Sequence, residues 1–164
     1  IRDRLRSRGL GDVYKRQLSD NGHLDLAFSL ASSQEYPSWG YWLKNEGTTF
    51  YENWDLTRIK DLSLNHMMFG EINAWFYKSL AGITPDENHP GFYRFNVKPG
   101  FAKGLDHFEA SFRSPNGEIR SEWIRKRRTI TYSVTVPSNS IAYLTLPDGE
   151  RELTCGRYTF KIKQ

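Results

Sequence analysis

The chain has 164 residues, of which 38% are hydrophobic and 15% aromatic, and this composition permits a globular protein of one or two small domains. Its formal net charge is +4, but the first seventeen residues hold six of the 23 basic and two of the 19 acidic side chains, so the remainder is balanced. A balanced remainder lacks the concentrated positive surface that nucleic acid or an acidic membrane would require. No apolar run approaches the roughly 20 residues of a membrane span. The single cysteine, Cys155, excludes an internal disulfide.

Residues 1–17 form a basic segment with no apolar periodicity of helix or strand type. Its end, Asp12-Val-Tyr-Lys-Arg-Gln17, resembles the in-frame translation of a transposon-end oligonucleotide used to prepare sequencing libraries. We therefore expect an artefactual leader, with a genuine disordered basic tail as the alternative.

Two helices are predicted in the first half of the chain. The apolar spacing over residues 21–30 suits a helix, with Asp20 or Asn21 available as its cap, and a Tyr-Pro break follows. A longer helix is predicted over residues 62–80, and Gly82 is placed to end it in a left-handed conformation. Apolar residues lie nearly all round this helix, which indicates burial on more than one side.

From about residue 93 the apolar period changes to two, which predicts short half-buried strands. The basic run Arg125–Arg128 is predicted to be a solvated hairpin turn, and Asp148-Gly149 to be another turn. The sequence thus predicts an α+β protein by segment: helices over residues 18–83, then an antiparallel sandwich or roll over residues 84–164. The predicted strands are 93–97, 108–112, 119–123, 129–136, 141–146 and 158–162.

Aromatic residues are concentrated between Tyr36 and Trp75, around one carboxylate, Glu52, with His66 a short loop away. Indole and phenol rings cover the apolar faces of a sugar, while their polar edges and nearby carboxylates bind its hydroxyls. This stretch therefore suits a carbohydrate pocket. The histidines His23, His89 and His107 are too scattered to predict a metal site.

Three strings in order carry a family resemblance: Tyr36-Pro-Ser-Trp-Gly, Thr48-Thr-Phe-Tyr-Glu-Asn-Trp and Leu64-Asn-His-Met-Met-Phe-Gly. They resemble the C-terminal end of bacterial α-L-rhamnosidases, and the resemblance runs from about Leu18 to the last strands. It implies the end of a catalytic six-hairpin α/α barrel followed by a C-terminal β-sandwich. It also implies hydrolysis of terminal α-L-rhamnosyl linkages of glycosides or polysaccharides with inversion, without a cofactor or a metal.

The resemblance implies a role for individual residues. Glu52 takes the position of the general base and His66 that of a sugar-contacting histidine, and we expect Trp39, Trp42 and Trp54 to line the pocket. The family more often has Trp where this chain has Tyr51, and the loop from Glu52 to His66 is shorter than expected. The compartment stays open between a bacterial cytoplasm and a periplasmic or secreted location.

The chemistry sets a further expectation. An inverting glycosidase needs a carboxylate that activates water and a carboxylic acid that protonates the leaving oxygen, roughly 6.5–9.5 Å apart. Asp55 is a poor second candidate, because three residues after Glu52 in an irregular loop it would more naturally orient a neighbour or cap the next turn. In the family the acid lies much earlier in the barrel. We therefore expect this chain to be a fragment that is inactive alone.

Simpler interpretations remain for each residue. Glu52 could be a capping or surface carboxylate, His66 a satisfied core histidine, and the tryptophans core aromatics at a helix junction. The alternative functions are a non-catalytic carbohydrate-binding module and a structural β-domain with attached helices.

Overall fold

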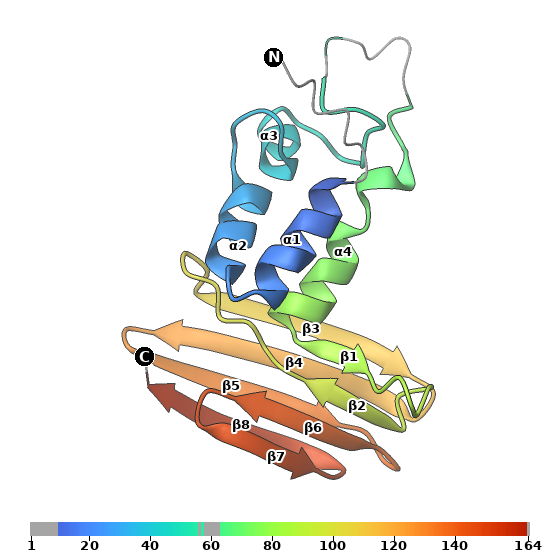
Figure 1. Cartoon of the computed structure of the whole chain (residues 1–164), viewed down its shortest axis with the longest axis vertical. Coiled ribbons are helices and arrows are strands. Elements are labelled where there is room, and N and C mark those ends of the chain that lie inside the picture. Colours follow the sequence, from blue (N-terminus) through green and yellow to red (C-terminus); the bar gives the residue numbers. More distant parts are fainter. Residues whose placement is uncertain (1–9, 56, 58–62, 164) are drawn as a thin grey trace. The chain divides into compact units, whose positions relative to one another are not determined.

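The computed structural model describes residues 10–55, 57 and 63–163. The chain divides into two compact units, with the change between Trp75 and Phe76 (Figure 1). The sequence placed this change at residues 83 and 84. It lies earlier because the last helical turns belong to the β unit, where the Tyr77 hydroxyl donates to the Ser111 carbonyl oxygen (2.9 Å) and the Phe76 ring lies 6.3 Å from that of Phe108.

The first unit is helical. Its elements are α1 (Leu10–Asp20), α2 (Leu24–Ser32), α3 (Trp39–Lys44), the 3₁₀ turn η2 (Met67–Phe69) and α4 (Ile72–Trp75). None of the helices in the described part of the chain is long and apolar enough to cross a bilayer.

Helix α1 occupies the end of the segment that we expected to be a leader. It is continuous from Leu10 to Asp20, and Lys15 within it is 2% exposed. The Ser19 hydroxyl donates to the Lys15 carbonyl oxygen (2.8 Å) and accepts from Trp75 Nε1 (2.9 Å). Residues 10–17 are therefore helical rather than irregular, whereas residues 1–9 lie outside the described part.

The other helices differ from the predictions in their ends. Helix α2 matches the helix predicted over residues 21–30, but it starts after His23, which makes no side-chain cap, and Asn21 instead donates to the carbonyl oxygen of Gln17. Helix α3 was not predicted. Its N-cap is Ser38, whose hydroxyl accepts from the Tyr41 N–H (3.0 Å) and so satisfies one of the free donors of the first turn.

The long helix predicted over residues 62–80 is interrupted. A turn at Gly70 and Glu71 separates η2 from α4, and the π-helix η3 (Phe76–Leu80) follows directly. The predicted start, Leu62, lies outside the described residues. The predicted end is confirmed, because Gly82 has a φ of +75°.

The second unit contains two four-stranded sheets. The order in one is β1-β2-β6-β7 and in the other β3-β4-β5-β8. All six predicted strands are present, with two further ones, β1 and β7. The bounds are β1 (Ile83–Pro85), β2 (Arg94–Val97), β3 (His107–Ser114), β4 (Gly117–Lys126), β5 (Thr129–Val136), β6 (Ile141–Leu146), β7 (Gly149–Leu153) and β8 (Gly156–Lys163).

One strand pair departs from the antiparallel arrangement that was predicted. Strands β2 and β6 are parallel, with Asn96 opposite Tyr143, whereas all other pairs in the two sheets are antiparallel. A parallel pair needs a long crossover, and here the chain builds β3, β4 and β5 of the other sheet before it returns.

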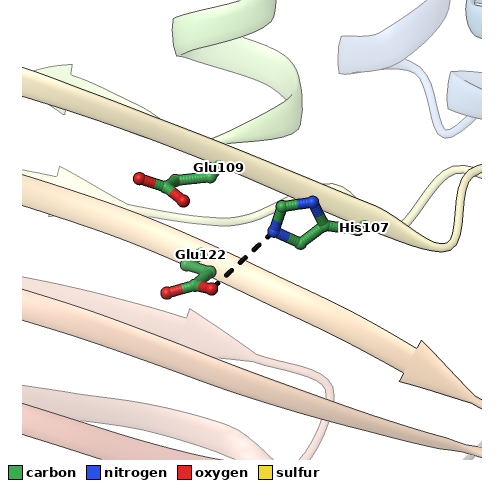
Figure 2. A group of neighbouring side chains, drawn as sticks. All are labelled: His107, Glu109 and Glu122. Carbon is green, nitrogen blue, oxygen red and sulfur yellow. Dashed lines mark ion pairs between the residues drawn. The ribbon is translucent and has the colours of Figure 1, made fainter.

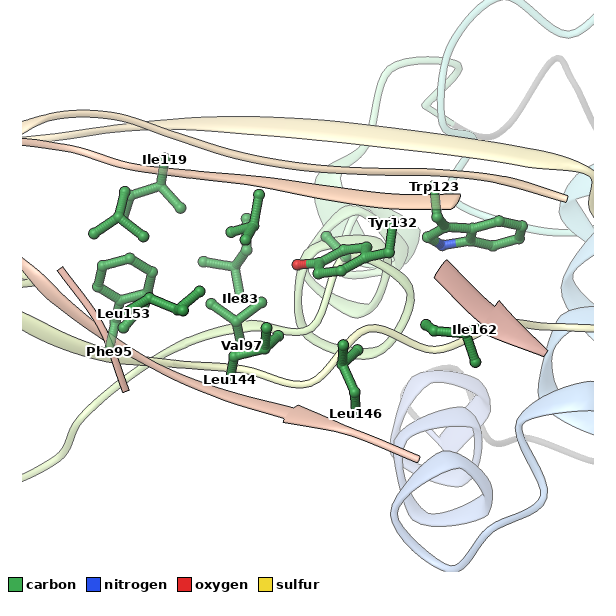
Figure 3. Close-up of a cluster of buried hydrophobic side chains, with 14 of the residues drawn as sticks. Ile83, Phe95, Val97, Ile119, Trp123, Tyr132, Leu144, Leu146, Leu153 and Ile162 are labelled. Carbon is green, nitrogen blue, oxygen red and sulfur yellow. The ribbon is translucent and has the colours of Figure 1, made fainter. Parts of the chain in front are cut away.

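The core of this unit lies between the two sheets (Figure 3). Alternate residues of β5 and β6 face inward, which follows from the period of two along a strand. Tyr132 is fully buried, and its hydroxyl lies 3.2 Å from Ser121 Oγ, which itself donates to the Ala81 carbonyl oxygen (2.7 Å). Burial raises the pKa of Tyr132, so this hydroxyl stays neutral and donates to Ser121.

The basic run is only partly the solvated turn that was predicted. Arg127 and Arg128 are exposed at the turn between β4 and β5. Arg125, however, directs its guanidinium to the carbonyl oxygens of three residues in the preceding loop, at 2.7–2.9 Å: Phe101, Ala102 and Leu105. A planar group with several donors can hold a loop in this way, so Arg125 has a structural role.

Gly82 allows a test of the backbone at the start of the β unit. An added Cβ at Gly82 would lie 2.1 Å from the carbonyl carbon of Lys98, whereas at Gly104, which has a similar positive φ of +82°, it would meet no atom within 4 Å. We expect Gly104→Ala to lower the free energy of unfolding by about 1 kcal/mol, because alanine is strained in the left-handed conformation. We expect Gly82→Ala to cost about 1–3 kcal/mol more, as measured by urea unfolding. Equal losses in the two variants would contradict the role of this close approach.

Candidate functional site

Glu52 lies where two segments of the helical unit run side by side. The Glu52 N–H donates to the Ser63 carbonyl oxygen (3.0 Å), and the His66 N–H donates to the Phe50 carbonyl oxygen (2.8 Å). The structure therefore brings Glu52 and His66, which the sequence selected together, onto one paired backbone stretch.

The carboxylate of Glu52 is held in place by the same pairing. Its Oε2 atom accepts a hydrogen bond from the Ser63 N–H (3.0 Å), and the residue is half-buried. A carboxylate offers acceptor sites on two oxygens, so this bond orients the group and leaves capacity for a water or a sugar hydroxyl.

His66 has its ring orientation fixed by the backbone. It precedes η2, and its Nδ1 atom accepts from the Met68 N–H (3.1 Å). Since Nδ1 acts as the acceptor, the proton of the neutral ring lies on Nε2. The half-buried ring can thus donate an Nε2–H hydrogen bond to a hydroxyl group.

An aromatic cluster, defined as Trp39, Trp42, Trp54 and Phe69, supports the segment that carries Glu52. The Trp54 ring lies 4.3 Å from both Trp42 and Phe69 and 4.9 Å from Trp39, measured between centroids. The Tyr51 ring lies 5.4 Å from Trp42. Tyr51, which precedes Glu52, and Trp54, two residues after it, therefore both pack on Trp42, so the backbone is anchored on either side of Glu52.

The three predicted pocket tryptophans differ in exposure. Trp42 is 3% exposed and Phe69 2%, so Trp42 is a core residue that positions the segment and has little surface to offer a sugar. Trp39 and Trp54 are half-buried, and Trp39 is fixed by a hydrogen bond from its Nε1 to the Phe69 carbonyl oxygen (3.1 Å). Of the three, only Trp39 and Trp54 keep surface for a ligand.

Asp55 behaves as the sequence predicted. Its Oδ1 atom accepts from both the backbone N–H (2.9 Å) and the hydroxyl (2.6 Å) of Thr57. Asp55 therefore orients Thr57, as expected of a carboxylate at this place in the loop.

Lys15 contributes to this unit although no sequence pattern indicates this role. Its Nζ atom lies 3.6 Å from the centroid of the Trp39 ring, in a cation–π contact. Such contacts are stronger when the cation is removed from water, and Lys15 is buried. The segment around Lys15 has no apolar period, so pattern reading could not connect it to Trp39.

One group of side chains that could bind a metal ion lies on the β unit and contains one of the three histidines that are scattered in the sequence. The side-chain ligand atoms of His107, Glu109 and Glu122 lie within 4.8 Å of one another on β3 and β4 (Figure 2). His107 Nε2 lies 3.7 Å from Glu122 Oε1, and Arg120 lies 2.9 Å from Glu109 and 3.5 Å from Glu122. A metal ion would have to displace Arg120, so we interpret the group as a surface ion-pair network.

Comparison with known families gives two consecutive matches. Residues 12–80 match the bacterial α-L-rhamnosidase six-hairpin glycosidase domain, and residues 82–160 match the bacterial α-L-rhamnosidase C-terminal domain. The first match includes residues 12–17, which lie in helix α1.

Individual relatives agree. An α-L-rhamnosidase of Alteromonas sp. (strain LOR) is 33% identical over 137 residues, which are 79% of this chain and 15% of that protein. The solved α-L-rhamnosidase of Dictyoglumus thermophilum has the same fold, with a TM-score of 0.85 at 23% identity over 96% of this chain and 21% of that one. A Streptomyces avermitilis α-L-rhamnosidase complexed with L-rhamnose has a TM-score of 0.78 at 26% identity, over 89% of this chain and 17% of that one. The chain thus spans about a seventh of the curated relative's length, and its fold class is confirmed as the end of a six-hairpin domain followed by a β domain.

The supporting role of the buried Trp42 can be tested by comparing its substitution with that of an exposed apolar neighbour. Trp42→Ala removes the ring on which Tyr51 and Trp54 pack, and we expect a loss of about 3–5 kcal/mol in the stability of the helical unit. Leu43→Ala, next to it and 73% exposed, should change stability by no more than about 0.5 kcal/mol. Urea unfolding followed by near-UV circular dichroism measures both. A small effect of Trp42→Ala would mean that the cluster does not hold this unit together.

Proposed function

Since the chain belongs to the bacterial α-L-rhamnosidase family, we propose that it forms the C-terminal part of a glycoside hydrolase that removes terminal α-L-rhamnosyl residues with inversion. The observation that carries this proposal is the placement of Glu52. Its carboxylate accepts a hydrogen bond from the Ser63 N–H, and the rings of Tyr51 and Trp54, on either side of Glu52 in the sequence, pack on Trp42. A half-buried carboxylate with a free acceptor position suits a general base that draws a proton from water.

The proposed reaction assigns Glu52 one of two steps. Glu52 takes a proton from a water molecule as that water attacks the anomeric carbon from the face opposite the leaving group. A second carboxylic acid, roughly 6.5–9.5 Å away, protonates the departing glycosidic oxygen. Asp55 is engaged with Thr57, so we assign the acid to a part of the parent enzyme that precedes this chain. The chain alone is then inactive.

The sugar would be held by groups on either side of Glu52. Trp54 and Trp39 offer ring surface to the apolar face of a rhamnosyl unit, including its methyl group. His66 offers Nε2–H to a hydroxyl.

Exposed apolar side chains of the helical unit support its origin in a larger barrel. Leu26 and Leu30, one turn apart on α2, are 50% and 51% exposed, and Leu43 is 73% exposed. Residues four apart in a helix lie on the same face, so α2 presents an apolar stripe. Neighbouring helices of a barrel would cover such a stripe.

Two other functions remain as alternatives. In a carbohydrate-binding module the same rings would bind a sugar without hydrolysis, and in a structural domain they would bind nothing. The partial exposure of Trp39 and Trp54 favours sugar contact over a purely structural role.

Glu52 is tested in the full-length parent enzyme. We expect Glu52→Gln to lower kcat on an aryl α-L-rhamnoside about 10²–10⁴-fold with little change in KM, because the amide keeps the size of the carboxylate but cannot accept a proton. Glu35→Gln, an exposed carboxylate in the same unit, is the control and should keep full activity. Proton NMR of the first product should show the β anomer of L-rhamnose. Unchanged kcat in Glu52→Gln would exclude Glu52 as the base.

The binding role of Trp54 is tested on this chain itself. We expect no hydrolysis of an aryl α-L-rhamnoside by the chain, but weak binding of L-rhamnose that Trp54→Ala lowers at least about tenfold. Trp75→Phe, at a buried ring of the same unit, provides the control for general loosening. Saturation-transfer NMR with L-rhamnose measures the effect. Binding that survives in Trp54→Ala would remove Trp54 from the sugar site.

A further inference from the structure

A polar hollow lies on the β unit, on the sheet formed by β1, β2, β6 and β7. Its volume is about 340 Å³, and it spans β2, β6 and β7. The polar side chains that line it are a tyrosine ring, an amide, a threonine hydroxyl, two carboxylates and a guanidinium: Asn96, Tyr143, Thr145, Glu150, Arg151 and Glu152.

Strand alternation places all of these groups except Arg151 on the outer face of the sheet, since Arg151 lies opposite the buried Leu144. In β6 the residues Ala142, Leu144 and Leu146 are buried in the core, so Tyr143 and Thr145 point outward. Residues directly opposite on paired strands have neighbouring side chains. Asn96 lies opposite Tyr143, and Tyr143 lies opposite Glu152, so the three form one row across the sheet.

From this row we propose a second saccharide-binding site, on the outer face of the sheet and centred on Tyr143. The half-buried Tyr143 ring provides a fixed flat surface for the apolar face of a sugar. Asn96 can both donate to and accept from hydroxyl groups, and Glu152 accepts from them. Thr145 and Glu150, whose side-chain oxygens lie 3.4 Å apart, form a second polar row beside the first.

The charges of the hollow favour a neutral saccharide over an anionic one. Arg151 is the cation of the lining, but its guanidinium donates to both carboxylate oxygens of Asp148, at 3.0 and 2.8 Å. The same pairing lowers the pKa of Asp148, so Asp148 stays ionised as the pH falls toward its usual range. Glu150 and Glu152 are then left to repel a uronate or a phosphate.

This site does not depend on the proposed hydrolysis. Tyr143 belongs to the second unit, whereas Glu52, His66 and Trp54 belong to the first. Loss of one site therefore leaves the other measurable.

The test is a titration of the full ¹⁵N-labelled chain with L-rhamnose, D-galactose and D-galacturonate. We expect at least one neutral sugar to shift the backbone amide signals of Asn96, Tyr143 and Glu152. Tyr143→Ala should weaken this binding at least about tenfold. Tyr93→Ala, at a tyrosine that is 51% exposed and outside the hollow, is the matched control and should leave it unchanged, as should Trp54→Ala.

Several results would overturn the proposal. These are the absence of shifts at the three amides with every sugar, an equal loss in Tyr143→Ala and Tyr93→Ala, or tighter binding of D-galacturonate than of either neutral sugar. Glu152→Gln keeps the shape of the exposed side chain and provides a second variant if Tyr143→Ala does not fold. We expect it to weaken neutral-sugar binding several-fold and to reduce the discrimination against D-galacturonate, and no change in either quantity would also overturn the proposal.

Discussion

The contact of Trp42 with the rings of Tyr51 and Trp54 is the interaction on which the candidate site depends. Glu52 lies in an irregular segment, where the backbone has no regular ladder to fix it. Its position is set instead by two flanking rings on a buried indole and by its pairing with Ser63. Because aromatic rings bury large areas with few rotatable bonds, they can hold a loop at a small entropic cost. A catalytic carboxylate on such a loop can be precise without belonging to a helix or a strand.

The β unit achieves order by a different means, the strict alternation of its strands. One set of side chains fills the space between the sheets, and the other set is left to face outward. A polar group in this interior needs a hydrogen-bond partner. The buried hydroxyl of Tyr132 is paired with Ser121, which in turn donates to the Ala81 carbonyl oxygen. The outer face carries no such constraint. Polar and aromatic residues can therefore gather around Tyr143 without a cost to the core.

The sequence predicted the strands well and the helices less well, for physical reasons. Strands β5 and β6 were predicted to the residue. Apolar and polar side chains alternate strictly along them, and this alternation indicates a strand with one buried face. Strand β7 has only one buried residue, Leu153, and strand β1 only three residues, so neither shows the alternation. The interrupted helix before Gly82 was not predictable from apolar spacing, which continues across the turn at Gly70. Helix α1 was missed because its segment has no apolar period, and from Tyr14 to Asp20 its buried side chain is Lys15, a residue that patterns assign to the surface.

The sequence selected the residues of the candidate site but did not show how the fold supports them. The order of the three aromatic strings selected Glu52 and His66, yet nothing in that order distinguishes Trp42 as a core ring from Trp54 as a surface one. The hydrogen bonding of His66 was also not visible in the sequence. Its Nδ1 atom accepts from the Met68 N–H, so the same ring that begins η2 is committed to the tautomer that donates from Nε2. A helix cap thereby sets the direction of a hydrogen bond toward a ligand, and the local fold and the proposed recognition of the sugar depend on one side chain.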